Sequence, residues 1–273
     1  MKKINHLPAT ICFTAVLLLT GSSVFAQKGT MYAQNTTVIQ LDKYTFRADN
    51  FLFTDALDAN NQMRHTASFD LLLTDDAALR DAVTLFQVSK ERPSIRMVFI
   101  TLNYAGENIQ ERFYDNTVVE EILLPALDAT SKLAFKATIK IRAEKVEQQK
   151  GSIKTQLASR NKYAALCSNF SLSLGKLPAN RVSKISGLSI KPGNQQSINF
   201  TIEISALDGA AWNQWFLTGA GGAVQQGVIS ILAPNLKDAL YNISLADVEI
   251  VSYSNSAGNR VLIGLRTKSV AIK

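Results

Sequence analysis

Two stretches of the chain, about half its length apart, share one pattern of hydrophobic and polar positions. In residues 197–216, the apolar residues Phe200, Ile202 and Ile204 alternate with polar ones, which indicates a strand with one apolar face. An aspartate and then a stripe of apolar residues at helical spacing follow. Residues 68–86 repeat this order. The pattern predicts a strand that runs into a short helix, present twice, and suggests an internal duplication.

The apolar stripe of each predicted helix identifies the residues expected to face the core. These core-helix residues are Leu79, Val83 and Phe86 in the first helix and Trp212, Trp215 and Phe216 in the second. Residues three or four apart share one face of a helix, so each set can cover a sheet. Because the two tryptophans are three residues apart, an aromatic platform for a sugar is the alternative to core packing.

Further alternating segments predict strands after each strand–helix unit. Residues 133–142 place Leu133, Phe135 and three later apolar residues on one face and basic residues on the other. Residues 261–270 have the same arrangement at the end of the chain. Each of these two segments follows an earlier predicted strand that contains a tyrosine. These tyrosines, Tyr114 and Tyr241, are interpreted as matching positions.

The prediction for the fold is therefore a mainly β protein with two tandem, similar β-barrel or sandwich domains, each with one short helix. We place the first β-domain at residues 27–143 and the second at 168–273, and between them a linker at 144–167. This linker is rich in charged residues and glutamine, and either a flexible segment or a solvated helix fits it. Two unrelated β-domains that resemble each other by chance are the alternative to duplication.

The first 26 residues have the pattern of a secretory signal peptide. Lys2 and Lys3 precede an apolar run over residues 9–19, and small residues lead to a predicted cleavage between Ala26 and Gln27. The run is short for a membrane span, so we expect no stable membrane span. The mature protein is expected to be exported, to the periplasm or to the extracellular space. An uncleaved N-terminal anchor is the alternative.

Composition supports a folded chain and limits its partners. Hydrophobic residues make up 47% of the sequence, which allows a sizeable core and argues against disorder. The net charge is +7, but the basic residues are dispersed and not interleaved with aromatic ones, so we expect no nucleic-acid partner. Cys167 stands alone in the mature chain and is interpreted as a buried small apolar residue rather than a reactive thiol.

The sequence carries no catalytic signature, and we predict no enzymatic activity. Its mature part has a single histidine, His65, so neither a zinc site nor cysteine–histidine chemistry has a ligand set. Glu120 and Glu121 are adjacent on a predicted strand, where neighbouring side chains point to opposite faces and do not form one site. Asp75 and Asp76 are better explained as a helix cap. We therefore predict no catalytic, cofactor-binding or metal-binding residues and no cofactor.

The second half resembles the tail-tube proteins of contractile phage tails and the related Hcp tube proteins of type VI secretion. The similarity lies in the order of elements over residues 168–273, and more faintly over 37–143. Residues 185–188, Ile-Ser-Gly-Leu, resemble the family's V-S-G-L segment, and the predicted helix ends in Trp-Phe as the family's helix ends in W-L. The resemblance implies small β-barrels joined edge to edge into a ring, with six barrels contributed by three copies of a duplicated chain.

Two functions are consistent with the sequence. The first is an exported, non-enzymatic structural protein that self-assembles through strand edges into a ring or tube, as a homo-oligomer such as a trimer. The second is an exported binding module that recognises a sugar, a peptide or a surface partner through loops such as residues 55–64 and 219–222. Its partner would be another protein or a glycan.

Overall fold

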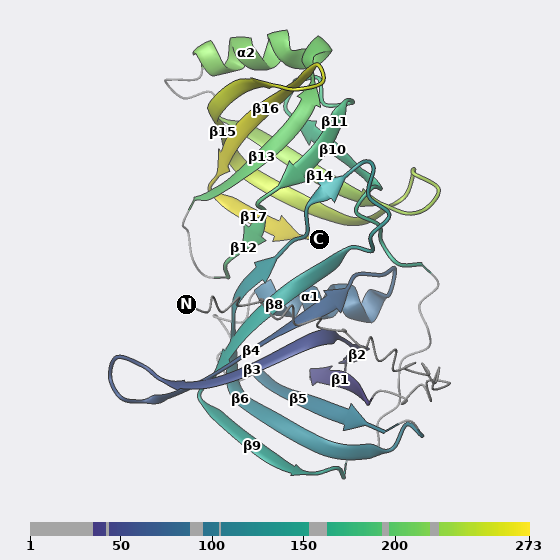
Figure 1. Ribbon diagram of the computed structural model, residues 1–273, viewed down its shortest axis with the longest axis vertical. Coiled ribbons are helices and arrows are strands. Elements are labelled where there is room, and N and C mark those ends of the chain that lie inside the picture. The colour runs from purple at the N-terminus through teal and green to yellow at the C-terminus, as the bar shows by residue number, and fades with distance from the viewer. Residues whose placement is uncertain are drawn as a thin grey trace, which may run out of the picture. The chain divides into compact units, whose positions relative to one another are not determined.

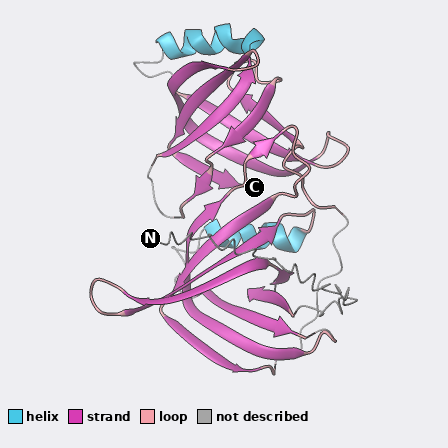
Figure 2. Ribbon diagram, viewed as in Figure 1, coloured by secondary structure: helices cyan, strands magenta, loops and turns pink. Residues whose placement is uncertain are grey.

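Strands dominate the computed structural model, and two α-helices lie among them in the part of the chain that it describes (Figures 1 and 2). The described residues are 35–41, 44–87, 95–103, 105–152, 163–192, 197–218 and 224–273. The fold is therefore mainly β, with two β domains that each contain one short helix.

The elements of the first half run from β1 to β9. Their bounds are β1 Thr36–Leu41, β2 Tyr44–Arg47, β3 Asp49–Leu57, β4 Met63–Leu72, α1 Ala77–Gln87, β5 Ile95–Leu102, β6 Asn108–Leu123, β7 Leu127–Asp128, β8 Lys136–Ala143 and β9 Lys145–Lys150. The elements of the second half are β10 Phe170–Leu174, β11 Val182–Ser186, β12 Ser189–Ile190, β13 Ile198–Ser205, the 3-10 turn η2 Ala206–Asp208, α2 Gly209–Thr218, β14 Gln225–Leu232, β15 Ala239–Ser256, β16 Arg260–Thr267 and β17 Ser269–Ile272.

The two halves have the same strand order. The first sheet runs β1-β5-β6-β8-β4-β3, with β2 beside β1 and β9 beside β6. The second runs β10-β14-β15-β16-β13-β11, with β17 beside β15. Every one of these pairs is antiparallel, and each of these strands except β2 has a counterpart with the same neighbours in the other sheet.

Irregularities in the ladders also recur at matching places. The β5–β6 ladder has a β-bulge near each of its ends, and so does the β14–β15 ladder. In each bulge the extra residue belongs to the longer strand, β6 or β15. The pairs that bracket the first bulge are Ile95↔Thr117 and Met97↔Tyr114 in one half, and Gln225↔Val248 and Gly227↔Leu245 in the other. Asn116 and Asp247 lie inside these two bulges with φ of 52° and 49°, a backbone conformation that Asn and Asp tolerate best after glycine. Shared bulges are a more specific similarity than shared strand order, because strand alternation alone does not require them.

Each half contributes a short strand to the sheet of the other. β7 of the first half pairs with β11, and β12 of the second half pairs with β6. Side chains add to this exchange: the Tyr241 hydroxyl donates to the Thr74 carbonyl at 2.6 Å, and the Gln87 amide both donates to and accepts from the backbone of Ile272 at 2.8 Å. One cluster of buried apolar residues extends through both halves, so their cores are continuous.

The core-helix residues mostly lie on the buried face of their helices. Leu79, Val83 and Phe86 of α1 are buried. Trp212 and Trp215 of α2 are buried, whereas Phe216 is half-buried and stacks on the ring of Tyr253. At about 100° per residue, Phe216 lies about 70° from the centre of the face that the two tryptophans share, which explains its partial exposure.

Several segments differ from the sequence-based interpretation, and in two of them the chain stays paired where polar residues suggested a linker. Residues 144–150, expected in the linker, include β9, which pairs with β6. Residues 163–167, also expected there, hydrogen bond to the first half, for example from the Ala165 amide to the Leu73 carbonyl at 3.0 Å. Leu133, expected on an apolar strand face, precedes β8 and is exposed. The proposed domain boundaries remain a prediction.

Residues 55–64, expected to form a loop or a hairpin tip, are the tip of a hairpin and are strand on both sides of its turn. They form the outer part of a long β3–β4 hairpin whose turn covers only residues 58–62, and this hairpin extends away from its own sheet (Figure 1, purple). Asp58 stabilises the turn, because its Oδ1 accepts hydrogen bonds from the backbone amides of Asn60 and Gln62 at 2.8 and 3.0 Å.

Candidate functional site

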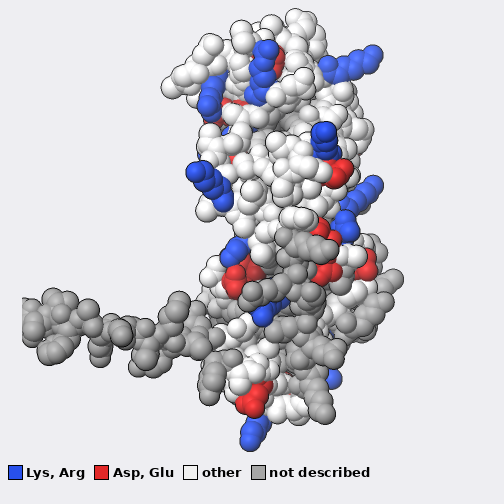
Figure 3. Space-filling view, turned by 90° about the vertical axis from the view of Figure 1, so that its right-hand side faces the viewer, with Lys and Arg blue, Asp and Glu red and all other residues white. Residues whose placement is uncertain are grey.

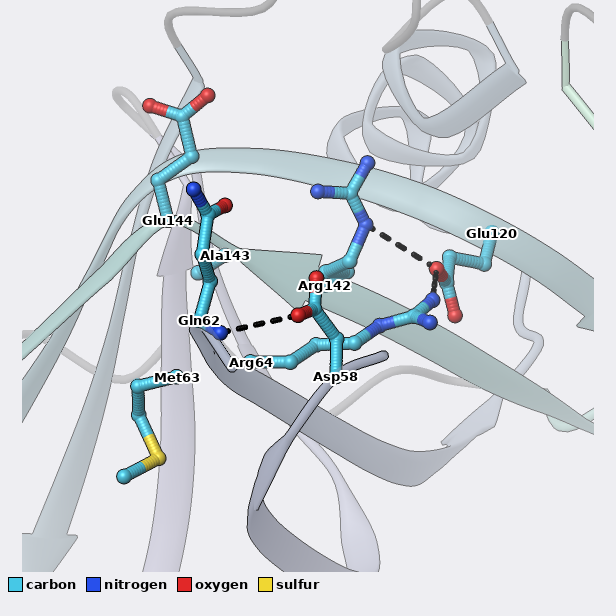
Figure 4. A pocket seen from close by; sticks show the side chains of 8 residues that line it. All are labelled: Asp58, Gln62, Met63, Arg64, Glu120, Arg142, Ala143 and Glu144. Carbon is cyan, nitrogen blue, oxygen red and sulfur yellow. Dashed lines mark hydrogen bonds and ion pairs between the residues drawn. The ribbon is translucent and has the colours of Figure 1, made fainter. Parts of the chain in front are cut away.

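A polar pocket of about 630 Å³ lies between the outer end of the β3–β4 hairpin and strands β6 and β8 (Figure 4). Its charged and amide side chains are Asp58, Gln62, Arg64, Glu120, Arg142 and Glu144. They come from four places: the hairpin turn, the start of β4, a bulge in β6 and the end of β8.

The bulge in β6 explains why an acidic residue reaches this pocket. Val119 pairs with Ile141 and Glu121 with Lys140, so Glu120 is the extra residue. Val119 and Ile122 are both buried although they are three residues apart, which places Glu120 and Glu121 together on the outer face. The expectation that these two carboxylates point to opposite faces is therefore wrong, because it assumed an uninterrupted pleat.

Glu120 joins the two arginines of the pocket. Its Oε1 accepts from the Arg142 Nε at 3.2 Å and also from Arg64. All three side chains are partly exposed, so these ion pairs contribute little to stability and chiefly orient the guanidinium groups. Figure 4 shows the terminal nitrogens of Arg142 directed away from Glu120. They offer two donors in the planar arrangement that suits a carboxylate or sulfate.

The other acidic groups of the pocket already have partners in the protein. Asp58 caps the hairpin turn, and the Glu144 carboxylate accepts from the Asn116 amide at 2.7 Å. Lys140 binds Glu121 at 2.9 Å on the neighbouring part of the face. The arrangement can therefore bind an anionic group through Arg142, and it positions no nucleophile beside a base.

His65 does not belong to this pocket. It lies on β4 rather than in a loop, next to Arg64 and thus on the opposite face of the hairpin, and its Nδ1 is 2.8 Å from the Asp55 Oδ1. In the described parts of the chain, no group of three or more His, Cys, Asp or Glu side chains is arranged to hold a metal ion.

The tryptophans are not available to a sugar. Trp212 has no exposed surface, and its indole N–H donates to the Pro178 carbonyl at 2.8 Å. Trp215 is buried against it, with the ring centroids 5.9 Å apart. The alternative of an aromatic platform is therefore wrong for this pair.

Cys167 is buried, and its thiol lies 3.6 Å from the Ala134 carbonyl. Burial raises the pKa of this thiol, which lowers the fraction of reactive thiolate. Two sequence-based predictions lie outside the described residues: the cleavage site at Ala26 and Gln27, and the loop at residues 219–222.

Strand edges are the second candidate site. Within the described ranges, β3 pairs with β4 alone and β10 with β14 alone, so each ends its sheet with one side of the strand unpaired. On the outer part of the hairpin, Leu57 and Met63 face each other across the ladder and expose 60% and 53% of their surface. Exposed edges of this kind can pair with another strand.

Charge is mixed on the surface. On the face seen in Figure 3, Lys and Arg side chains of the described residues alternate with Asp and Glu and do not merge into one basic area. Neither helix in the described ranges has the length and apolar character needed to cross a membrane.

Comparison with known proteins gives a similarity of low extent. No protein-family model matches the chain, and no curated protein matches it. Among solved structures, a chain of the anti-feeding prophage cap, the AFP tube terminating cap, is similar over 44% of this chain and 90% of its own length, with 13% identity and a TM-score of 0.31. The chain is thus similar in part to a phage-related tube cap, at a level that assigns it neither a family nor an activity.

Proposed function

We propose that this chain is an exported, non-enzymatic structural protein that assembles with copies of itself through strand edges. The observation that carries the proposal is the β3–β4 hairpin. In it, β3 is the edge strand of its sheet, and an exposed apolar pair lies at the outer end of the hairpin. A long edge strand with exposed apolar side chains is a liability in a monomer, and pairing with another chain removes it.

The likeness of the two halves supports the same proposal. A chain with two similar halves, related by duplication of one ancestral segment, can present one kind of contact at both of its ends. Contacts of that kind join chains head to tail and close into a ring when the rotation between copies allows it. A ring or tube of three or more copies is the form of assembly that we expect.

Self-association of the protein that begins at Gln27 tests this proposal. Light scattering coupled to size exclusion is expected to give a mass of at least two chains, rising with protein concentration, because edge contacts form by mass action. Negative-stain images then distinguish rings from open filaments. A single-chain mass at every concentration would contradict assembly.

The alternative function, a binding module, is favoured by the terminal nitrogens of Arg142, which point away from Glu120 in the polar pocket (Figure 4). We expect such a module to bind an oligosaccharide or peptide that carries carboxylate or sulfate groups. Titration with a uronic-acid oligosaccharide, followed by amide NMR, should move resonances around the pocket, and Arg142→Gln should weaken binding roughly ten-fold or more. Arg266→Gln is the matched control, because Arg266 holds the equivalent place in the second half and pairs with Glu249. Equal effects of both substitutions would count against the pocket.

A further inference from the structure

The contact between the two halves shows how one half binds the next. On β6, Leu123 pairs with Ser189 and Ile122 with Ile190, and the Leu124 amide donates to the Leu188 carbonyl at 3.1 Å. β12 therefore fills the side of β6 that β8 leaves open. The segment that carries β12 is the connection between β11 and β13.

Within the described residues, no strand pairs with the equivalent side of β15. The matched bulges place Tyr253 and Ser254 at the positions of Ile122 and Leu123. In the described residues, the end of β15 from Ser252 to Ser256 pairs with β16 alone. The second half thus offers the same edge that the first half offers to β12.

The segment of the first half that corresponds to the β12 connection pairs with no other half within the described residues. β3 and β4 correspond to β11 and β13, so the β3–β4 hairpin stands where the β12 connection stands in the second half. After β11, the chain leaves β13 and pairs with β6 of the other half. Residues 53–57 instead stay paired with β4, and the exposed Leu57 lies at the end of this strand. The free side of β3 is available to a further strand within the part of the chain that the structure describes.

An exposed leucine of the second half corresponds to a residue that is buried in the contact between the halves. Thr74 lies in the contact between the halves, where it accepts the Tyr241 hydroxyl and exposes 3% of its surface. Its counterpart in the second half, after the equivalent strand, is Leu207, which exposes 72%. A leucine at this place is solvent-exposed in the single chain and would be covered by a neighbour that docks as the second half does.

From this internal repetition we propose that the β3–β4 hairpin of one copy docks on the open edge of β15 in a second copy. The contact repeats the one that joins the two halves, and it is head to tail. It rests on the proposed function and specifies its interface.

Only one of the two strand exchanges can recur between copies. β7 lies in the connection 124–135, whereas the second half has a tight turn at residues 257–259 in its place. The contact between copies is therefore smaller than the contact between halves, and we expect it to be reversible and concentration-dependent.

Cross-linking between two singly substituted proteins tests the interface. In a Cys167→Ala background, protein with Ala56→Cys is mixed with protein with Ser254→Cys and treated with a short bismaleimide. A covalent dimer of the two proteins is expected, and much less from either protein alone. The control partner is Lys237→Cys, in the exposed turn at the opposite end of β15, which should give no dimer.

Leu207→Asn provides a second measurement, because the exposed side chain of Leu207 contributes little to the stability of the fold. Removing a leucine from a buried contact should weaken self-association roughly ten-fold or more. Leu236→Asn is the matched control: this leucine is 59% exposed, in the turn before β15, and its replacement should leave association unchanged.

The outcomes separate this inference from the function on which it rests. A wild-type protein that is monomeric at all concentrations overturns both. An oligomer that cross-links through Lys237→Cys, or that responds equally to the two leucine substitutions, overturns the proposed interface and leaves assembly standing.

Discussion

Trp212→Ala is expected to lower the free energy of unfolding by roughly 3–5 kcal/mol, the cost of removing a large aromatic side chain from a packed core. Trp212 has no exposed surface, and it makes a 2.8 Å hydrogen bond to Pro178 that alanine cannot replace. Urea unfolding followed by circular dichroism measures the loss. Since small proteins are stable by only about 5–15 kcal/mol, the variant should unfold at much lower urea concentration.

Phe216→Ala is the matched control on the same helix. Its ring is half-buried and stacks on Tyr253 with centroids 6.3 Å apart, so its removal should cost less than half as much. A Trp212→Ala protein with the wild-type urea midpoint would show that α2 does not hold the second half together. An equal loss for both substitutions would show that the helix buries its face differently.

Alternation along the chain was sufficient to predict the mainly β fold and its repetition. The apolar positions of β4, β8, β13 and β16 recur every second residue, and these strands are regular where they pair with one another. A local pattern of this kind reports which face of a strand is buried. Alternation therefore identifies strands that pair without bulges.

The same pattern could not predict where strands are interrupted or prolonged. β6 is one strand of 16 residues, but its bulges shift the alternation and make it look like two. The match of Tyr114 with Tyr241 was wrong for the same reason. Tyr241 pairs with Ile231 directly before a bulge, and the residue in that place in the first half is Gln110. Tyr114 lies four residues further along its strand and pairs with Met97. Register is set between strands, so a single strand does not reveal it.

The candidate pocket depends on that register. Arg64 and Arg142 are 78 positions apart and meet because β4 pairs with β8, and Glu120 joins them only through its bulge. Basic residues on the outer face of β8 were visible in the sequence, as was the pair of glutamates. Nothing in the sequence placed them together, because the bulge is a property of the β6–β8 ladder.

Phe99→Ala is expected to destabilise both halves together, although Phe99 lies in the first half. Its ring is 2% exposed and makes edge contacts with Phe53, Phe69 and Tyr114 at centroid distances of 5.3, 5.7 and 5.0 Å. Loss of this ring should cost roughly 3–5 kcal/mol. Because β7 and β12 are exchanged and one core extends through both halves, the second half should unfold in the same transition.

The positions of the tryptophans make this coupling measurable. Both lie on α2, so tryptophan fluorescence reports on the second half alone, while circular dichroism reports on the strands of both. In the Phe99→Ala protein, the two signals should move to the same lower urea midpoint, because neither half keeps its sheet complete without the strand that the other contributes. A fluorescence transition that stays at the wild-type midpoint while circular dichroism shows an earlier step would mean that the halves unfold independently. The strand exchange would then be a surface contact, too weak to serve as the pattern for a contact between copies.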